Sequence, residues 1–132
     1  MHLTDHTDYS IRVLMYLNQK KTLVTLNELA ESLNISKNNL IKVSNQLAKA
    51  DFITTVKGRS GGLILNKNMG KRNLKDIIVE TEKRFNIAVC FTKDTKCDCS
   101  FVKNCKLQRT LNEALNSFLD SLASKTLNDL TS

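Results

Sequence analysis

The segment between residues 25 and 65 constrains the fold most, because its hydrophobic pattern changes period partway along. In TLNELAESLN, Thr25 and Glu28 form an S/T-x-x-E capping box, and a helical stripe of apolar residues follows: Leu26, Leu29, Ala30 and Leu33. After the short break NIS, Ser36 is placed to cap a further helix that carries Leu40, Val43 and Leu47. The pattern then becomes β-rich in FITTVKGRSGGLIL, around a turn that holds three of the four glycines of the chain. Glycine supplies the positive φ that tight hairpin turns demand.

A helix, a short turn, a second helix and a hairpin follow the order of a winged helix-turn-helix. Further helices flank this unit. Ile11, Leu14 and Leu17 mark a first helix, and Asn73 is placed to cap another whose apolar face is expected to hold Leu74, Ile77, Ile78 and Phe85. We therefore predict a mainly α protein with a winged helix-turn-helix DNA-binding domain over residues 1–70. Residues 71–132 are expected to hold a linker helix, a cysteine-rich loop at 90–105 and a long C-terminal dimerisation helix.

The last helix is expected to reach residue 130 and to be apolar on much of its circumference. One stripe is spaced by 4, 4, 3 and 4 residues, and a second set widens it: Leu107, Leu111, Leu115, Phe118 and Leu122, then Leu119, Leu127 and Leu130. One small domain does not easily cover such a helix, so pairing with a second copy is favoured. The alternative is that the helix folds back on its own domain.

Charge is concentrated in the same region as the hairpin. Between Asn34 and Lys75 the sequence has nine Lys or Arg and one acid, whereas the net charge of all 132 residues is +7. This distribution favours a polyanionic partner, and together with the helix order it predicts binding to double-stranded DNA. A solvated basic face without a partner is the alternative. The start of the chain lacks a secretory signal, and no apolar run approaches the roughly 20 residues that cross a bilayer, so we expect a cytoplasmic protein without a membrane segment.

The expected DNA contacts follow from the winged-helix order. The N-terminal end of the second helix of the motif reaches base edges, and it carries Ser36, Lys37, Asn38 and Asn39. Further along, Lys42 and Lys49 are placed nearer to phosphates. Arg59 lies at the tip of the Gly-rich turn, where it can enter a minor groove, and Lys57 and Ser60 lie beside it.

All four cysteines lie within the 16 residues CFTKDTKCDCSFVKNC, at positions 90, 97, 99 and 105. Thiolates in such a cluster bind iron–sulfur centres, zinc or copper(I). Structural zinc usually shows paired C-x₂₋₄-C knuckles, which this stretch lacks. A thiol–disulfide switch and a zinc site remain alternatives to a cluster. A [4Fe–4S] cluster takes one ligand on each iron, and Cys97 and Cys99 are too close in sequence to reach separate irons without strain, so three thiolates plus an outside ligand are reasonable.

The segment TLNELAESLNISKNNLIKVSNQLAKADFITTVKGRSGGLIL resembles the winged-helix core of the Rrf-two family of bacterial transcription regulators. The opening LTDHTDYSIRVLMYL is similar to the first helix of that family, and the cysteine stretch and last helix match its sensor loop and dimerisation helix. The likeness is greatest to the nitric-oxide-sensing repressors of the family. One departure is Asp51, which stands where many relatives have glycine at the end of the recognition helix and leaves the shape of that turn open.

The resemblance implies a ligand set for an iron–sulfur cluster. By similarity the cysteine ligands are Cys90, Cys99 and Cys105, and Cys97 is an extra cysteine that stands as a substitute for Cys99. In the nitric-oxide-sensing members the fourth ligand is an aspartate of the other subunit, which matches Asp8 of the partner subunit. Asp8 is also simply an acid near a helix start, where the dipole favours it, and His2 and His6 are competing ligands. A sister subgroup has histidine where this chain has Gln108, which argues against that subgroup.

We therefore expect a homodimeric transcriptional repressor that binds a palindromic operator and senses nitric oxide through an iron–sulfur cluster. The chain has no Gly-rich phosphate loop, no H-E-x-x-H and no nucleophile elbow, so an enzyme is not expected. The alternative is a thiol–disulfide or zinc-containing regulator without a cluster.

Overall fold

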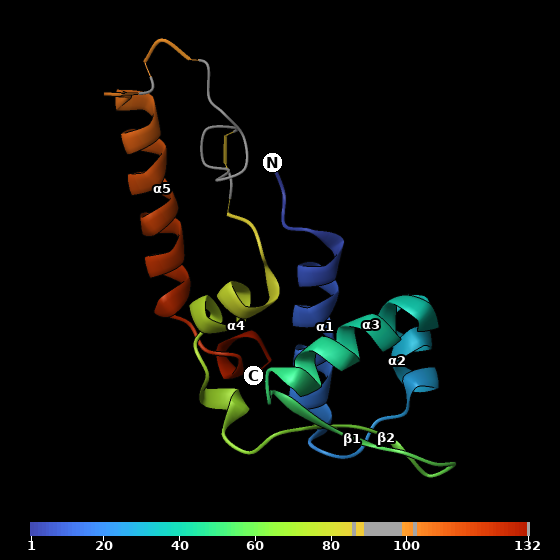
Figure 1. Ribbon diagram of the computed structural model, residues 1–132. Coiled ribbons are helices and arrows are strands. Elements are labelled where there is room, and N and C mark those ends of the chain that lie inside the picture. The colour runs from blue at the N-terminus through green and yellow to red at the C-terminus, as the bar shows by residue number, and fades with distance from the viewer. Residues whose placement is uncertain (86, 89–98, 102, 132) are drawn as a thin grey trace.

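The computed structural model describes residues 1–85, 87–88, 99–101 and 103–131 (Figure 1). The chain forms, in order, α1 (Asp5–Lys20), α2 (Leu26–Leu33), α3 (Lys37–Lys49), β1 (Ile53–Val56), β2 (Gly62–Leu65), the 3-10 turn η1 (Met69–Lys71), α4 (Leu74–Thr81), α5 (Lys106–Ala123) and the 3-10 turn η3 (Asn128–Leu130). This mainly helical chain with its two-stranded hairpin confirms the predicted winged helix-turn-helix architecture with a C-terminal helix.

Local capping signals set the starts of α2 and α3. The hydroxyl of Thr25 accepts the Glu28 N–H at 3.1 Å, and the hydroxyl of Ser36 accepts the Asn39 N–H at 3.2 Å. Each bond satisfies a backbone donor that the first helical turn leaves without a partner. Glu28, the other residue of the predicted capping box, accepts a hydrogen bond from the Tyr16 hydroxyl at 2.9 Å. This bond ties α2 to α1.

The end of α3 is a Schellman motif built on an aspartate. Asp51 has φ 64, and its N–H donates to Ala48 O at 3.1 Å, while the Phe52 N–H donates to Leu47 O at 2.9 Å. Phe52 and Leu47 are both buried, which supplies the hydrophobic contact of the motif. The side-chain amide of Asn66 donates to Asp51 O at 2.8 Å and helps to hold the turn. Asp51 therefore adopts the left-handed backbone conformation that glycine most often provides at the end of a helix.

The wing is an antiparallel pair in which Ile53 lies opposite Leu65 and Val56 lies opposite Gly62. Of the turn glycines, Gly58 takes a positive φ of 106, as expected. Gly62 is needed for a different reason, since a Cβ there would lie 2.3 Å from Val24 O. That close approach lets Val24 pair with Leu63 through two backbone hydrogen bonds of 2.8 and 2.7 Å, which fixes the wing against the start of α2.

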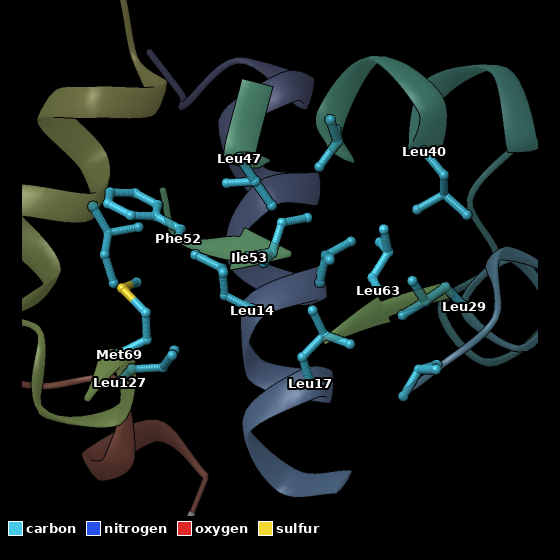
Figure 2. Close-up of a cluster of buried hydrophobic side chains, with 14 of the residues drawn as sticks. Leu14, Leu17, Leu29, Leu40, Leu47, Phe52, Ile53, Leu63, Met69 and Leu127 are labelled. Carbon is cyan, nitrogen blue, oxygen red and sulfur yellow. The ribbon is translucent and has the colours of Figure 1, made fainter. Parts of the chain in front are cut away.

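The core is organised around α1, which crosses its centre (Figure 2). Leu14 and Leu17 on α1 are fully buried, and so are Leu40 and Leu47 on α3. The position of the recognition helix is therefore fixed largely by side chains of α1. The core continues into the second half of the chain through Leu74, Ile77 and Leu127. The division at residue 70 stays a prediction.

Two helix boundaries differ from expectation. Asn73 caps α4 as predicted, with its side chain accepting the Asp76 N–H at 2.9 Å. However, α4 ends at Thr81, where the backbone becomes extended at Glu82, so Phe85 is not on its face. The last helix ends at Ala123 and does not reach residue 130. Most of α5 extends away from the helical domain in Figure 1, while its C-terminal part contacts α4, where Lys75 pairs with Asp120 at 3.8 Å. None of the residues of α5 is buried.

The chain after α5 folds back onto its own subunit. The Leu127 N–H donates to Arg72 O at 3.0 Å, and the Leu74 N–H donates to Lys125 O at 2.9 Å. Leu127 is fully buried, so its expected place on the apolar surface of the last helix was wrong. Backbone pairing with residues 72–74 competes with helix continuation here. Buried Asn18 on α1 adds to this anchor by donating to Thr131 Oγ1 at 2.7 Å.

Candidate DNA interface and cysteine site

The start of α3 presents polar side chains to solvent. Ser36, Lys37 and Asn38 are exposed, and Asn39 is half-buried. The Ser36 hydroxyl is occupied by the N-cap bond to Asn39, so its first role is to fix where the helix begins. Lys37 and Asn38 carry donors and acceptors that no hydrogen bond or ion pair among the described residues engages. This end of α3 therefore has the chemistry for base-edge contacts.

A cleft of about 480 Å³ lies between α3 and the wing. Three predicted contact residues line it together, namely Lys37 from α3 and Lys57 and Arg59 from the wing. Ser60 lies beside them in the same turn and is exposed. None of these cations forms an ion pair within the part of the chain that the structure describes. Unpaired cations on both walls make this cleft suited to a polyanion.

The exposed face of α3 continues beyond this cleft. Lys42 and Lys49 are exposed on the helix, one and a half to three turns from its start. The two lysines also lack ion-pair partners among the described residues. Sequence reasoning missed Ile41, which is 45% exposed on the same helix and lines the cleft beside Lys37. Ile41 was missed because it lies between two buried positions, Leu40 and Val43, and this pattern predicts a further core residue.

The structure describes two of the four cysteines. Cys105 is the N-cap of α5, and its sulfur accepts the Gln108 N–H at 3.3 Å. Cys99 is exposed, and Cys105 is half-buried. Cys90 and Cys97 lie outside the described residues. Negative charge is favoured at a helix N-terminus, so the position of Cys105 suits a thiolate ligand.

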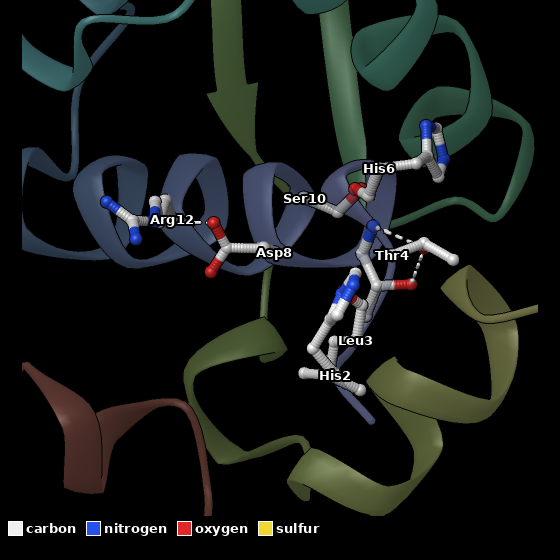
Figure 3. A network of polar contacts seen from close by, with 8 residues as sticks. His2, Leu3, Thr4, His6, Asp8, Ser10 and Arg12 are labelled. Atoms are coloured by element: carbon white, nitrogen blue, oxygen red, sulfur yellow. Dashed lines mark hydrogen bonds and ion pairs between the residues drawn. The ribbon is translucent and has the colours of Figure 1, made fainter.

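Asp8 lies on α1, and its carboxylate pairs with the Arg12 side chain at 3.0 Å (Figure 3). Its side chain is 44% exposed, so a second subunit can reach it. His6 points to the other side of α1 in Figure 3, and its Nε2 is buried and has no hydrogen-bond partner among the described residues. His2 is exposed, and its ring nitrogen contacts the neighbouring Leu3 carbonyl. Only Asp8 of these three combines a charged oxygen ligand with access from outside.

The start of α1 is tied to the end of α4 by a contact that the sequence did not indicate. Glu82 is buried, and one oxygen of its carboxylate accepts both the Thr4 N–H at 3.1 Å and the Thr4 hydroxyl at 3.0 Å. The Thr4 hydroxyl in turn accepts the Thr7 N–H as the N-cap of α1. Thr4 and Glu82 are 78 residues apart, so no local pattern points to this pair.

The described donors fit an iron–sulfur group in chemistry. Thiolates are the usual ligands of such groups, and both described sulfurs are accessible to some degree. Among the described residues, no three His, Cys, Asp or Glu side chains gather closely enough to hold a metal ion. The predicted set also includes Cys90, which is outside those residues, and Asp8 of the partner subunit. The predicted ligands therefore stay a prediction.

The Rrf2 family profile, described as an iron-dependent transcriptional regulator, matches residues 3–132. The chain belongs to the Rrf2 family. The HTH-type transcriptional regulator NsrR of Bacillus licheniformis is 41% identical over 132 residues, covering 98% of this chain and 92% of that protein. The protein of the same name from Bacillus subtilis is 38% identical, with coverage of 98% and 90%. The predicted resemblance to this family is thus confirmed, and these relatives carry the name NsrR.

Solved structures of Rrf2-type regulators share the fold. The oxidized form of Staphylococcus aureus CymR has a TM-score of 0.76 at 22% identity and covers 100% of this chain and 97% of that chain. IscR of T. potens has a TM-score of 0.71 at 22% identity, with coverage of 98% and 85%. The family match and the NsrR-named relatives make the chain a DNA-binding transcriptional regulator of the Rrf2 family and not an enzyme. No helix in the described ranges is long and apolar enough to cross a membrane.

Proposed function

We propose that this Rrf2-family repressor binds a palindromic operator as a cytoplasmic homodimer and releases it in response to nitric oxide. The sensor would be an iron–sulfur cluster, of the [4Fe–4S] type, held by Cys90, Cys99, Cys105 and Asp8 of the partner subunit, with Cys97 as the substitute for Cys99. When bound, the cluster supplies iron that nitric oxide attacks. The likeness to NsrR supports this assignment, and so does the iron-dependent description of the family.

The position of Asp8 carries the proposal. Asp8 is half-exposed on α1, and fully buried leucines of the same helix, Leu14 and Leu17, share a core with Leu40 and Leu47 of α3. A ligand bond to Asp8 would therefore fix the helix that positions the recognition helix. Oxygen is a poorer match than thiolate for iron–sulfur sites, so this bond would be the weakest of the set. Its loss would free α1 from the cysteine stretch of the other subunit.

The spacing of two recognition helices sets the fit to a palindromic site. In each subunit, Lys37, Asn38 and Asn39 would read base edges. Lys42 and Lys57 would hold phosphates, Arg59 would enter the minor groove, and Ser36 and Ser60 would support these contacts. A shift of α1 would change the spacing between subunits and lower affinity for the operator without altering these side chains.

The exposed face of α5 supports the homodimer. Leu107 is 65% exposed and Phe118 is 46% exposed, although both belong to the apolar stripe of the helix. Pairing with a second copy would cover this stripe. Phe118→Glu should weaken self-association at least tenfold in sedimentation equilibrium, because it places a charge inside the stripe. Asn116→Glu, on an exposed polar position of the same helix, is the matched control and should leave the dimer intact.

Asp8→Ala tests the sensing half of the proposal, with Asp5→Ala as the control. Both aspartates lie in the first turn of α1, so both changes remove the same favourable interaction with the helix dipole. Operator affinity is measured anaerobically before and after nitric oxide. We expect Asp8→Ala to lose most of the difference between the two states and Asp5→Ala to keep it. An Asp8→Ala protein that releases DNA like the wild type would contradict the proposal.

A thiol–disulfide regulator without a cluster, or one that holds zinc, is the second candidate. The exposed Cys99 thiol favours it, because an accessible thiol is open to direct oxidation. Iron, acid-labile sulfide and zinc assays on anaerobically purified protein separate the candidates. The DNA interface is the same under both.

A further inference from the structure

A second cleft, of about 1030 Å³, lies on the side of α3 away from the wing. One wall is formed by Lys42, Asn45 and Lys49 of α3, and the other includes Lys83 and Arg84, which follow α4. Asn45 lines this cleft and the wing-side cleft alike. The exposed face of α3 is thus a ridge with a cleft on either side.

This ridge has the layout of a helix that enters a major groove. The groove is about 12 Å wide, so a helix inside it has one phosphate strand on each side. Lys57 and Arg59 of the wing line the wing-side cleft and would face the strand on that side. The strand on the other side would face the second cleft, where Lys83 and Arg84 lie across from Lys42 and Lys49.

The cations of the second cleft are available to a ligand. Lys42, Lys49, Lys83 and Arg84 are all exposed, and none forms an ion pair among the described residues. Two carboxylates also line the cleft, and His6 lines it from α1. The Glu82 carboxylate is buried and accepts the two bonds from Thr4. Glu80 is exposed and is the one solvent-facing acid of this lining, so the cations outnumber the acids at the surface.

The cleft is also held in shape. The side-chain amide of Gln46 on α3 donates to Glu80 O of α4 at 3.1 Å. Two residues further along the same segment, the Glu82 carboxylate accepts the two hydrogen bonds that Thr4 donates. The backbone just before Lys83 and Arg84 is therefore anchored to both α3 and α1. This anchoring lowers the conformational entropy that Lys83 and Arg84 lose when they bind a phosphate.

We propose that Lys83 and Arg84 bind the phosphate backbone of the operator strand on the side of α3 opposite the wing. The inference rests on the placement of α3 in the major groove.

The test is the salt dependence of binding to a duplex that the wild-type protein selects from a random pool. The slope of log K against log salt is negative, and each lost phosphate contact lowers its magnitude by about 0.9. Lys83→Ala/Arg84→Ala removes four such contacts from a dimer on its operator, so it should lower the magnitude of the slope by about 3.6. Affinity should fall to a similar degree on unrelated duplexes, since phosphate contacts carry no sequence information. The charge-preserving Lys83→Arg/Arg84→Lys variant should keep the wild-type slope.

Lys106→Ala/Lys125→Ala is the matched control, because it removes two exposed cations, one at the first residue of α5 and one two residues after its end. An unchanged slope in the Lys83/Arg84 alanine variant would overturn the inference, and so would an equal fall in the control. The Arg59→Ala variant shows whether the second strand contact alone is wrong or whether DNA binding by the wing is wrong as well. If it lowers the slope while the Lys83/Arg84 variant does not, DNA binding by the wing stands and the second strand contact is wrong. A flat salt response in the wild type would instead contradict the major-groove placement.

Discussion

Replacing Leu127 with alanine tests whether the chain after α5 belongs to the core of its own subunit. Leu127 is fully buried and belongs to the same apolar cluster as Met69 and Leu14 (Figure 2). The change removes about three buried carbons, or roughly 2.4 kcal/mol at 0.8 kcal/mol each, and the cavity left behind adds to this. We expect the free energy of unfolding to fall by about 3 kcal/mol.

The assay is urea unfolding at several protein concentrations, together with sedimentation equilibrium. Leu127→Ala should lower stability at every concentration and leave the dissociation constant of the dimer unchanged. Leu130→Ala is the matched control, because this leucine lies three positions later and is 38% exposed. It should cost less than about 1 kcal/mol. If Leu127→Ala instead weakened the dimer and hardly changed subunit stability, residue 127 would lie on a continued helix and the described anchor would be wrong.

Ser36→Ala should lower the free energy of unfolding by about 1 kcal/mol, because it removes the N-cap of α3, and Ser36→Gly should cost only a few tenths in the same urea experiment. Asp51→Ala should cost about 1 kcal/mol at φ 64, whereas Asp51→Gly should stay within about 0.5 kcal/mol of the wild type; equal effects of the two would refute the left-handed turn. Glu82→Ala should cost about 1–3 kcal/mol because it leaves the Thr4 N–H without its acceptor, and hydrogen exchange should rise at the start of α1. The Thr126 N–H and hydroxyl hold the pKa of Asp129 below its usual value, so this turn stabilises the fold above the usual aspartate pKa and loses that effect as pH falls through the lowered value. Thr126→Val should raise the Asp129 midpoint in an NMR titration, and an unchanged midpoint would count against the hydroxyl contact.

Local signals in the sequence predicted most of the winged helix. Thr25, Ser36 and Asn73 cap helices as expected, because an N-cap needs only the side chain and the next three residues. The end of the last helix was not predictable in this way. Its apolar spacing runs on to Leu130, but backbone bonds to a segment some fifty residues earlier stop the helix at Ala123.

The residues of the candidate site likewise fall into those that local sequence predicts and those that only tertiary packing brings together. The cations of α3 and the wing follow from motif order and charge, and three of them, Lys37, Lys57 and Arg59, line one cleft together. Lys83 and Arg84 carry no local signal, since only tertiary packing brings them beside α3. The bond between Glu82 and Thr4 is likewise set by the fold, at a separation of 78 residues. Cys99 and Cys105 were predicted from spacing and likeness, and their ligand role remains a prediction.

The most direct test of the sensing claim is to purify the protein without oxygen and to measure iron, acid-labile sulfide and visible absorption before and after nitric oxide, with operator affinity followed in the same samples. We predict a brown protein with iron and sulfide, whose absorption is bleached and whose operator affinity falls when nitric oxide is added. A colourless protein without iron or sulfide that still binds DNA would contradict the cluster and leave the thiol or zinc regulator in its place.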